Sequence, residues 1–298
     1  MSDLSDKLYR KYNEILFPYA YNILGSGEEA KDAVQDVMVN YFSGEDKAVA
    51  DEKNYLIRAV VNTSINMRNR QKKMLRPGEQ WLPEPIATDD AADRDLYLGD
   101  ILSYSLLVLM EKLDARERAV FILKETFDYS HTDIASILDI TEEHSRKLLS
   151  RAKAHLFKPA SKRTAKQNSH ERDVLARLMS AIRGRDMQQV EGTMAADIQF
   201  YADGGGTAPL LATQKSGAAE VAALLITAYD RFLSSANLGY TLINHQPALL
   251  SYKEGRLIAC QVFDIHSASS AILQIHAVLD PDKLKALQQQ ALQTTDWL

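Results

Sequence analysis

The sequence has one cysteine, no long apolar run and little net charge. A single cysteine, Cys260, excludes an internal disulfide and any zinc site built from several cysteines. We expect it to be a small buried residue in a reducing compartment. No window approaches the ~18 uninterrupted apolar residues of a spanning helix, and the charged residues within 1–20 are unlike a signal peptide. We therefore expect a cytoplasmic protein without a membrane partner.

The net charge of −5 argues at first against nucleic acid as a partner, but its distribution argues the opposite. Lys53–Arg76 and His144–Arg163 each hold seven Lys/Arg and no Asp/Glu, whereas residues 81–110 hold six acidic residues and one Arg. Two separate basic blocks predict two contacts with a polyanion. A solvated basic face is the alternative for either block alone.

Residues 1–76 have the apolar spacing of helices. Ser26 and Glu29 are spaced as a capping box, and Gly25 ends the helix before it. The buried face of the capped helix is predicted to hold Ala30, Ala33, Val34, Val37, Met38, Tyr41 and Phe42. A second helix is expected from Asn54 to about Lys73, with Leu56, Ala59, Val60 and Met67 in the core.

Residues 77–105 and 161–170 are predicted to be linkers. The first contains Pro83, Pro85 and four aspartates between positions 89 and 95, a composition that disfavours a helix. The second is polar and basic. The linkers separate three expected domains at 1–76, 106–160 and 171–298.

The middle domain, residues 106–160, contains a helix-turn-helix pattern. Ser130 and Asp133 indicate a capped first helix, a turn is expected at 139–141, and a second helix runs from about 142 to 157. Leu148, Leu149, Ala152 and Leu156 are predicted to face inward, and Arg146, Lys147, Ser150 and Arg151 outward. A basic second helix of this kind can enter the major groove of DNA.

Residues 171–298 change class. A helix at 171–184 is followed by strand-like runs, an intervening helix near 218–233 and a terminal helix after Asp280. This order predicts an α+β domain with a curved antiparallel sheet.

Three segments resemble a bacterial extracytoplasmic-function (ECF) sigma factor. LGSGEEAKDAVQDVMVNYF resembles the core-binding helix of sigma region 2, and NYLIRAVVNTSINMRNRQKK resembles the helix that opens the −10 element. LDARERAVFILKETFDYSHTDIASILDITEEHSRKLLSRAKAHL resembles region 4, the −35 reader. The resemblance implies two all-α sigma domains, core RNA polymerase and promoter DNA as partners, and no enzymatic activity, metal or cofactor.

The remainder resembles the ECF subset with a SnoaL-like C-terminal extension. Its motifs appear as WLPEP (Trp81, Leu82, Pro83, Glu84, Pro85), DGGG (Asp203, Gly204, Gly205, Gly206) and DPDKL (Asp280, Pro281, Asp282, Lys283, Leu284). Asp280 replaces the usual Asn, Thr207 stands where Lys is common, and NHQPA at 244–248 lacks a second-position Gly. The subset implies an NTF2-like cone that regulates the sigma domains through these motifs. We expect Trp81 to dock on the extension.

The resemblance assigns roles by residue. Asn62, Asn66, Arg68, Arg70, Lys72 and Lys73 would contact the −10 element, and Arg146, Lys147, Ser150 and Arg151 the −35 element. Asp32, Gln35 and Asp36 would bind the clamp coiled coil of the largest polymerase subunit, while region 4 would sit on the flap of the second-largest. The acidic linker would thread the polymerase channel that RNA later occupies.

Two other functions remain open from the sequence. One is a ligand-responsive DNA-binding regulator that acts without polymerase. The other is a SnoaL-like cyclase or isomerase fused to DNA-binding helices, with a small ligand in the cone. Its acid/base candidates would be Asp203, His245, Asp264, His266 and His276. The three glycines are expected to set a turn with positive φ rather than bind phosphate.

Overall fold

The computed structural model describes residues 2–43, 51–74, 81–88, 96–156, 165–205, 214–291 and 296–297. The chain divides into two compact units. A helical unit consists of Met1–Arg76, Ala91–Leu102 and Leu106–Pro159, and a sheet unit of Pro77–Asp90, Ser103–Ser105 and Ala160–Leu298. The two helical regions thus share one unit, while the WLPEP segment belongs with the extension.

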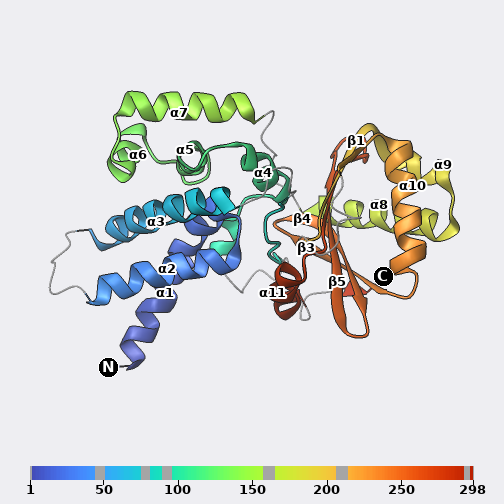
Figure 1. Cartoon of the computed structure of the whole chain (residues 1–298), viewed down its shortest axis with the longest axis horizontal. Helices are drawn as coiled ribbons and strands as arrows, with labels where there is room; N and C mark the ends of the chain where they lie inside the picture. The colour runs from blue at the N-terminus through green and yellow to red at the C-terminus, as the bar shows by residue number, and fades with distance from the viewer. Residues whose placement is uncertain are drawn as a thin grey trace. The chain divides into compact units, whose positions relative to one another are not determined.

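The helical unit begins with three long helices, α1 (Ser2–Leu24), α2 (Gly27–Ser43) and α3 (Glu52–Met74) (Figure 1). Gly25, with φ 74°, ends α1, and the Ser26 hydroxyl accepts the Glu29 backbone N–H at 3.2 Å. The predicted apolar face of α2 is buried from Ala30 to Met38. Phe42 is wrong as a core residue, because it is 46% exposed: the described residues do not cover the last turn of α2.

The rest of this unit includes the segment that resembles region 4. It contains η1 (Leu96–Asp100), α4 (Tyr104–Leu109), η2 (Met110–Lys112), α5 (Ala115–Glu125), α6 (His131–Leu138) and α7 (Glu142–His155). Helix α4 starts in the sheet unit and ends in the helical one. The predicted capping box of Ser130 and Asp133 is present, and Thr141 caps α7. Asp139 adopts a left-handed conformation that makes the turn between α6 and α7. The helix-turn-helix is therefore confirmed.

The sheet unit places helices first and then strands. Its elements are α8 (Ala165–Gly184), α9 (Met187–Gly192), β1 (Met194–Asp203), β2 (Gln214–Ser216), α10 (Ala218–Ala228), η3 (Tyr229–Leu233), β3 (Asn237–Ile243), β4 (Gln246–Lys253), β5 (Arg256–Ile265), β6 (Ile272–Val278), α11 (Pro281–Ala291) and β7 (Asp296–Trp297). Helix α8 starts inside the expected linker at 161–170. The remainder of that linker, up to residue 164, lies outside the described residues, as do the aspartates at 89–95.

The strands form one sheet in the order β2-β1-β6-β5-β4-β3-β7. Helices α8, α9 and α10 pack on one face through a single buried apolar cluster that includes Leu175, Val190, Phe200 and Phe263. The expected all-antiparallel sheet is wrong in one respect: β1 and β6 run parallel, since the chain passes through α10 and the β3–β5 meander before it returns beside β1. The predicted class, two all-α regions and an α+β extension, is confirmed.

The structure also bears on the single cysteine and on the lack of long apolar runs in the sequence. Cys260 lies buried on β5, and burial raises the pKa of its thiol. Among the described residues, no helix combines the length and apolar character needed to cross a bilayer.

Candidate promoter-binding and regulatory sites

The six residues assigned to the −10 element lie on the second half of α3, but they differ in exposure. Asn66, Arg70 and Lys73 are exposed, Asn62 and Lys72 are half-buried, and Arg68 is buried. Asn62, Arg68 and Lys72 contact region 4. The helix that resembles the DNA-opening element is thus partly covered within its own unit.

Asn62 joins α3 to the helix-turn-helix. Its side-chain amide donates to the backbone carbonyl of Ile137 on α6 and to that of Arg58, each at 2.9 Å. An amide with both protons engaged has no donor left for a base edge. Asn66, one turn further along α3, has an exposed side chain.

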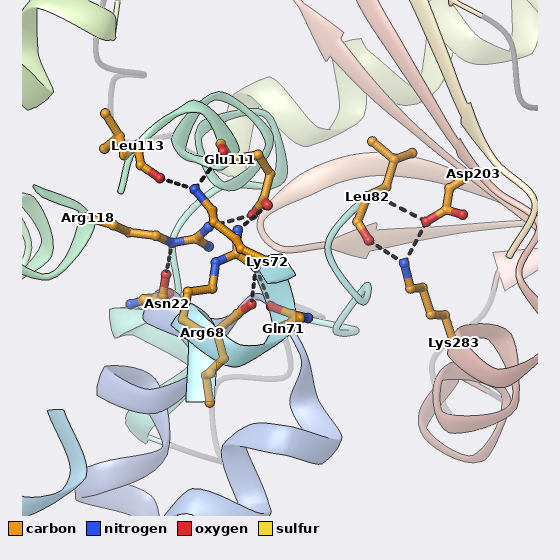
Figure 2. Close-up of polar contacts among 11 residues, drawn as sticks. Asn22, Arg68, Gln71, Lys72, Leu82, Glu111, Leu113, Arg118, Asp203 and Lys283 are labelled. Atoms are coloured by element: carbon orange, nitrogen blue, oxygen red, sulfur yellow. Dashed lines mark hydrogen bonds and ion pairs between the residues drawn. The ribbon is translucent and has the colours of Figure 1, made fainter. Parts of the chain in front are cut away.

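Arg68 is bound from both sigma regions (Figure 2). Its Nη1 donates to the Leu24 carbonyl at 3.0 Å and to Gln71 Oε1 at 2.6 Å, all within region 2. Its Nη2 pairs with Glu111 of η2. The other Glu111 oxygen pairs with Nη1 of Arg118 on α5 at 2.5 Å.

Lys72 and Arg118 complete this cluster. Lys72 Nζ donates to the backbone carbonyl of Leu113, and Arg118 Nε donates to the Asn22 carbonyl at 2.8 Å. Burial lowers the pKa of Lys72, and the nearby Arg68 lowers it further. Burial also lowers the pKa of Arg118 to about 10. The interface therefore crowds like charges around a single shared carboxylate.

The −35 candidates lie together on the outer face of α7. Arg146, Lys147, Ser150 and Arg151 are all exposed, while Leu148 and Ala152 are buried behind them. Arg146 pairs with Glu142 at 2.8 Å and Lys147 with Glu143 at 2.6 Å. Exposed i,i+4 pairs of this kind contribute only about 0.3–0.5 kcal/mol, so either cation can exchange its carboxylate for DNA.

The polymerase-binding candidates form an exposed stripe on α2. Asp32, Gln35 and Asp36 alternate with the buried residues Ala33 and Val37. The stripe continues one turn further to Val39, which is 57% exposed. An acidic face with an apolar end is therefore available in the helical unit.

The WLPEP segment is held by both motifs of the extension (Figure 2). Asp203, at the end of β1, accepts the Leu82 backbone N–H at 2.9 Å. Lys283 on α11 donates to the Leu82 carbonyl and to Asp203 Oδ2, both at 2.6 Å. The Lys283 ammonium also lies 4.5 Å from the centre of the Trp81 ring. Main chain, carboxylate, ammonium and indole thus form one site, with Leu82, Pro83, Glu84 and Pro85 all buried.

The contacts continue along the linker to Thr88. The side-chain oxygen of Asn244 accepts the Ile86 backbone N–H at 3.0 Å, and the Asn244 backbone N–H donates to the Ile86 carbonyl at 2.9 Å. Thr88 N–H donates to the Leu242 carbonyl at 2.9 Å. Further on, the Tyr104 hydroxyl donates to the Pro83 carbonyl at 2.6 Å. The segment 81–88 is therefore bound at both ends, at Leu82 by Asp203 and Lys283 and at 86–88 beside the end of β3.

The DGGG and DPDKL motifs meet beside this segment. Gly205 has φ 59°, the positive value expected, and its N–H donates to Asp203 Oδ1 at 3.0 Å. A Cβ at Gly205 would lie 2.6 Å from Cγ of Asp280. Asp280 in turn caps α11 by accepting the Asp282 N–H at 2.9 Å. Pro281 and Leu284 belong to the same helix, Gly204 is buried, and Gly206 lies outside the described residues.

Comparison with known proteins assigns the helical unit. Family models for sigma-70 region 2 and sigma-70 region 4 match residues 8–74 and 103–156. The ECF RNA polymerase sigma factor SigJ of Mycobacterium tuberculosis is 26% identical over 283 residues, covering 90% of this chain and 89% of SigJ. The SigJ crystal structure shares the fold, with a TM-score of 0.72 and 22% identity, over 94% of this chain and 98% of that one. SigG of the same species is 25% identical over 213 residues, covering 62% of this chain and 58% of SigG.

The chain carries the sigma-70 region 2 and region 4 domains of an ECF sigma factor and is homologous to SigJ. These regions imply RNA polymerase and promoter DNA as partners.

The acid/base candidates of this sigma factor lie in different surroundings. Asp203 binds the linker, His245 donates its backbone N–H to Thr88 at 2.6 Å, and Asp264 lies 3.4 Å from the Gln246 amide. His266 contacts Ser269 in its own loop. His276 is buried, and neither ring nitrogen has a hydrogen-bond partner among the described residues.

Sequence reasoning missed the residues that connect distant segments in this sigma factor. Glu111 lies in an apolar run, seven positions before Arg118, and an isolated acid in such a run was the available signal. Asn244 was noted only as part of a motif. Tyr104 and Gln246, whose side chains bind Pro83 and the Ser105 backbone, carried no signal.

Proposed function

We propose that this ECF sigma factor recruits core RNA polymerase to promoters and that its extension controls this step by binding the linker. The stripe of Asp32, Gln35 and Asp36 would meet the clamp coiled coil of the largest subunit, and region 4 the flap of the second-largest. The exposure and the acidic character of the α2 stripe support its assignment to the clamp. Helix α7 would read the −35 element and α3 would open the −10 element.

The observation that carries the regulatory proposal is the double contact of Lys283 and Asp203 with Leu82. Both polar groups of the Leu82 main chain are satisfied by the extension. A linker bound in this way cannot also thread a polymerase channel. The two sites for the linker are mutually exclusive, which is the differential contact that coupled regulation requires.

The helical unit supports the same proposal independently. Asn62, Arg68 and Lys72 of the −10 set contact region 4. A sigma factor in this arrangement cannot present its full −10 surface. We propose that it is the inactive state and that polymerase binding separates regions 2 and 4.

We assign no catalytic role and no cofactor to the extension. Asp203 is engaged by the linker and Lys283, and the face of the sheet under α8–α10 is packed with apolar side chains. Regulation through protein contacts, rather than through a small ligand, is the simpler proposal.

In-vitro transcription with core polymerase tests this function. The full chain should initiate at its promoter. Asp203→Asn should raise initiation at limiting polymerase, because the amide removes the ion pair with Lys283 and loosens Leu82. Asp230→Asn, which removes the exposed pair with Arg185 in the same unit, is the matched control. Equal activity of all three proteins would exclude linker capture as the control step, and turnover of a small molecule without polymerase would favour an enzyme.

A further inference from the structure

One carboxylate, Glu111, is shared by buried arginines from the two sigma regions (Figure 2). The side chains of Arg68 and Arg118 are 1% and 0% exposed, and that of Glu111 is 19% exposed. Arg68 belongs to α3 of region 2 and Arg118 to α5 of region 4. Glu111 itself lies on η2, within region 4, and pairs with an arginine of each region.

Contacts within region 2 orient Arg68 independently of Glu111. Leu24 and Gln71 fix its Nη1, which leaves the Nη2 side directed toward region 4. A guanidinium held by one edge binds carboxylate and phosphate oxygens with the same geometry. Lys72, one turn further along α3, points its ammonium toward the same segment, at the Leu113 carbonyl.

The charge balance of the interface is unfavourable without Glu111. Three cations, Arg68, Lys72 and Arg118, lie around this carboxylate, and the like charges of Arg68 and Arg118 each lower the pKa of Lys72. Removal of one partner from a buried ion pair leaves a charge without compensation, which is strongly destabilising. An external polyanion would offset the same charges.

We propose that Glu111 is an internal substitute for a DNA phosphate: its carboxylate occupies Arg68 in the closed unit, and its departure frees Arg68 for the DNA backbone. The inference rests on the proposed role of α3 at the −10 element. It explains how a region 4 side chain keeps the buried arginine of the DNA-binding helix from contacting DNA. It also makes opening responsive to the polyanion that polymerase delivers.

Nonspecific DNA binding by the full chain tests the substitution without polymerase. The probe is a 30-base-pair duplex with no promoter sequence, and affinity is measured by fluorescence anisotropy across salt concentrations. Each phosphate neutralised contributes about 0.9 to the slope of log K against log salt. Glu111→Gln should steepen the slope by about 0.9, for the one freed cation Arg68, and tighten binding near 0.1 M salt by about eightfold.

Glu14→Gln is the matched control, since it makes the same charge change at an exposed position on α1, and it should leave the slope unchanged. If Glu111→Gln does not fold, Glu111→Asp keeps the charge but is too short to bridge both arginines, and it should steepen the slope by part of that amount. A folded variant at position 111 with the wild-type slope overturns the proposal. Because no polymerase is present, that result is separate from the outcome for Asp203→Asn.

Discussion

The side-chain amide of Asn62 on α3 donates to the backbone carbonyl of Ile137 on α6, at 2.9 Å. A residue assigned to promoter opening is thus hydrogen-bonded to the domain assigned to promoter recognition. One side chain can serve the closed state or the open complex, but not both. The relationship makes Asn62 a probe of each.

Asn62→Ala should lower promoter opening more than duplex binding. The alanine removes the amide that would satisfy a separated base and, in the free protein, also removes a contact worth about 0.5–1.5 kcal/mol. A permanganate footprint measures opening and a gel shift measures binding. Asn66→Ala provides the comparison, because its side chain is exposed and its loss should affect opening alone. Equal loss of both signals in Asn62→Ala would argue against the −10 role.

Arg146→Ala should relax −35 specificity. Loss of one bidentate contact to guanine is expected to cost about 1–3 kcal/mol, whereas its surface pair with Glu142 contributes little. Promoter-library profiling measures the preference directly. Lys147→Ala should instead weaken all sequences alike, as a phosphate contact does. An unchanged −35 preference in Arg146→Ala would remove the arginine from base recognition.

Gly205→Ala should destabilise the sheet unit and release the linker. An L residue at φ 59° costs about 1–2 kcal/mol, and the added Cβ would press against the Asp280 carboxylate. The only two tryptophans of the sequence, Trp81 and Trp297, both belong to this unit. A Trp297→Phe background therefore lets Trp81 fluorescence report linker docking. Gly184→Ala, with no atom within 4 Å of the added Cβ, should leave that signal unchanged.

Acidification should destabilise the sheet unit through His276. The ring lies between those of Tyr201 and Tyr104, at 5.5 and 5.6 Å between centroids, and burial lowers the pKa of His276 from 6.5 to about 3. Between pH 6.5 and about 3, His276 is therefore protonated in the unfolded state but neutral in the folded state. The free energy of unfolding falls as the pH drops through this range.

The loss should reach about 2 kcal/mol at pH 5. Urea unfolding followed by tryptophan fluorescence at pH 7 and pH 5 measures it. His276→Phe, which keeps an aromatic ring, should remove this part of the pH dependence. His266→Phe, at an exposed position, should retain it. A pH dependence identical in wild type and His276→Phe would contradict the assignment.

Local patterns were sufficient to predict most elements. The caps at Ser26 and Ser130 and the turn at 139–141 act over a few residues, so their positions follow from neighbouring side chains. The outward face of α7 follows from helical periodicity for the same reason. The parallel pairing of β1 with β6 was not predictable in this way, because it is decided by the intervening 68 residues rather than by either strand.

The regulatory contacts depended on motif resemblance or were missed. Trp81 was expected on the extension, but only the structure identifies Lys283 as its partner. Glu111 and Arg118 are seven residues apart in sequence, whereas Arg68 is 43 residues from Glu111. Nothing near Arg68 in the sequence distinguishes a DNA-binding cation from one buried against region 4.

The distance between regions 2 and 4 tests the central claim most directly. Asn69 on α3 and Ala154 on α7 are exposed, and Cys260 is buried, so cysteines introduced at 69 and 154 can carry spin labels. Double electron–electron resonance on the full chain, free and bound to core polymerase, measures the distance between the two labels. The account predicts one short distance in the free protein and a longer one in the complex. The same short distance in a complex that initiates transcription would contradict it.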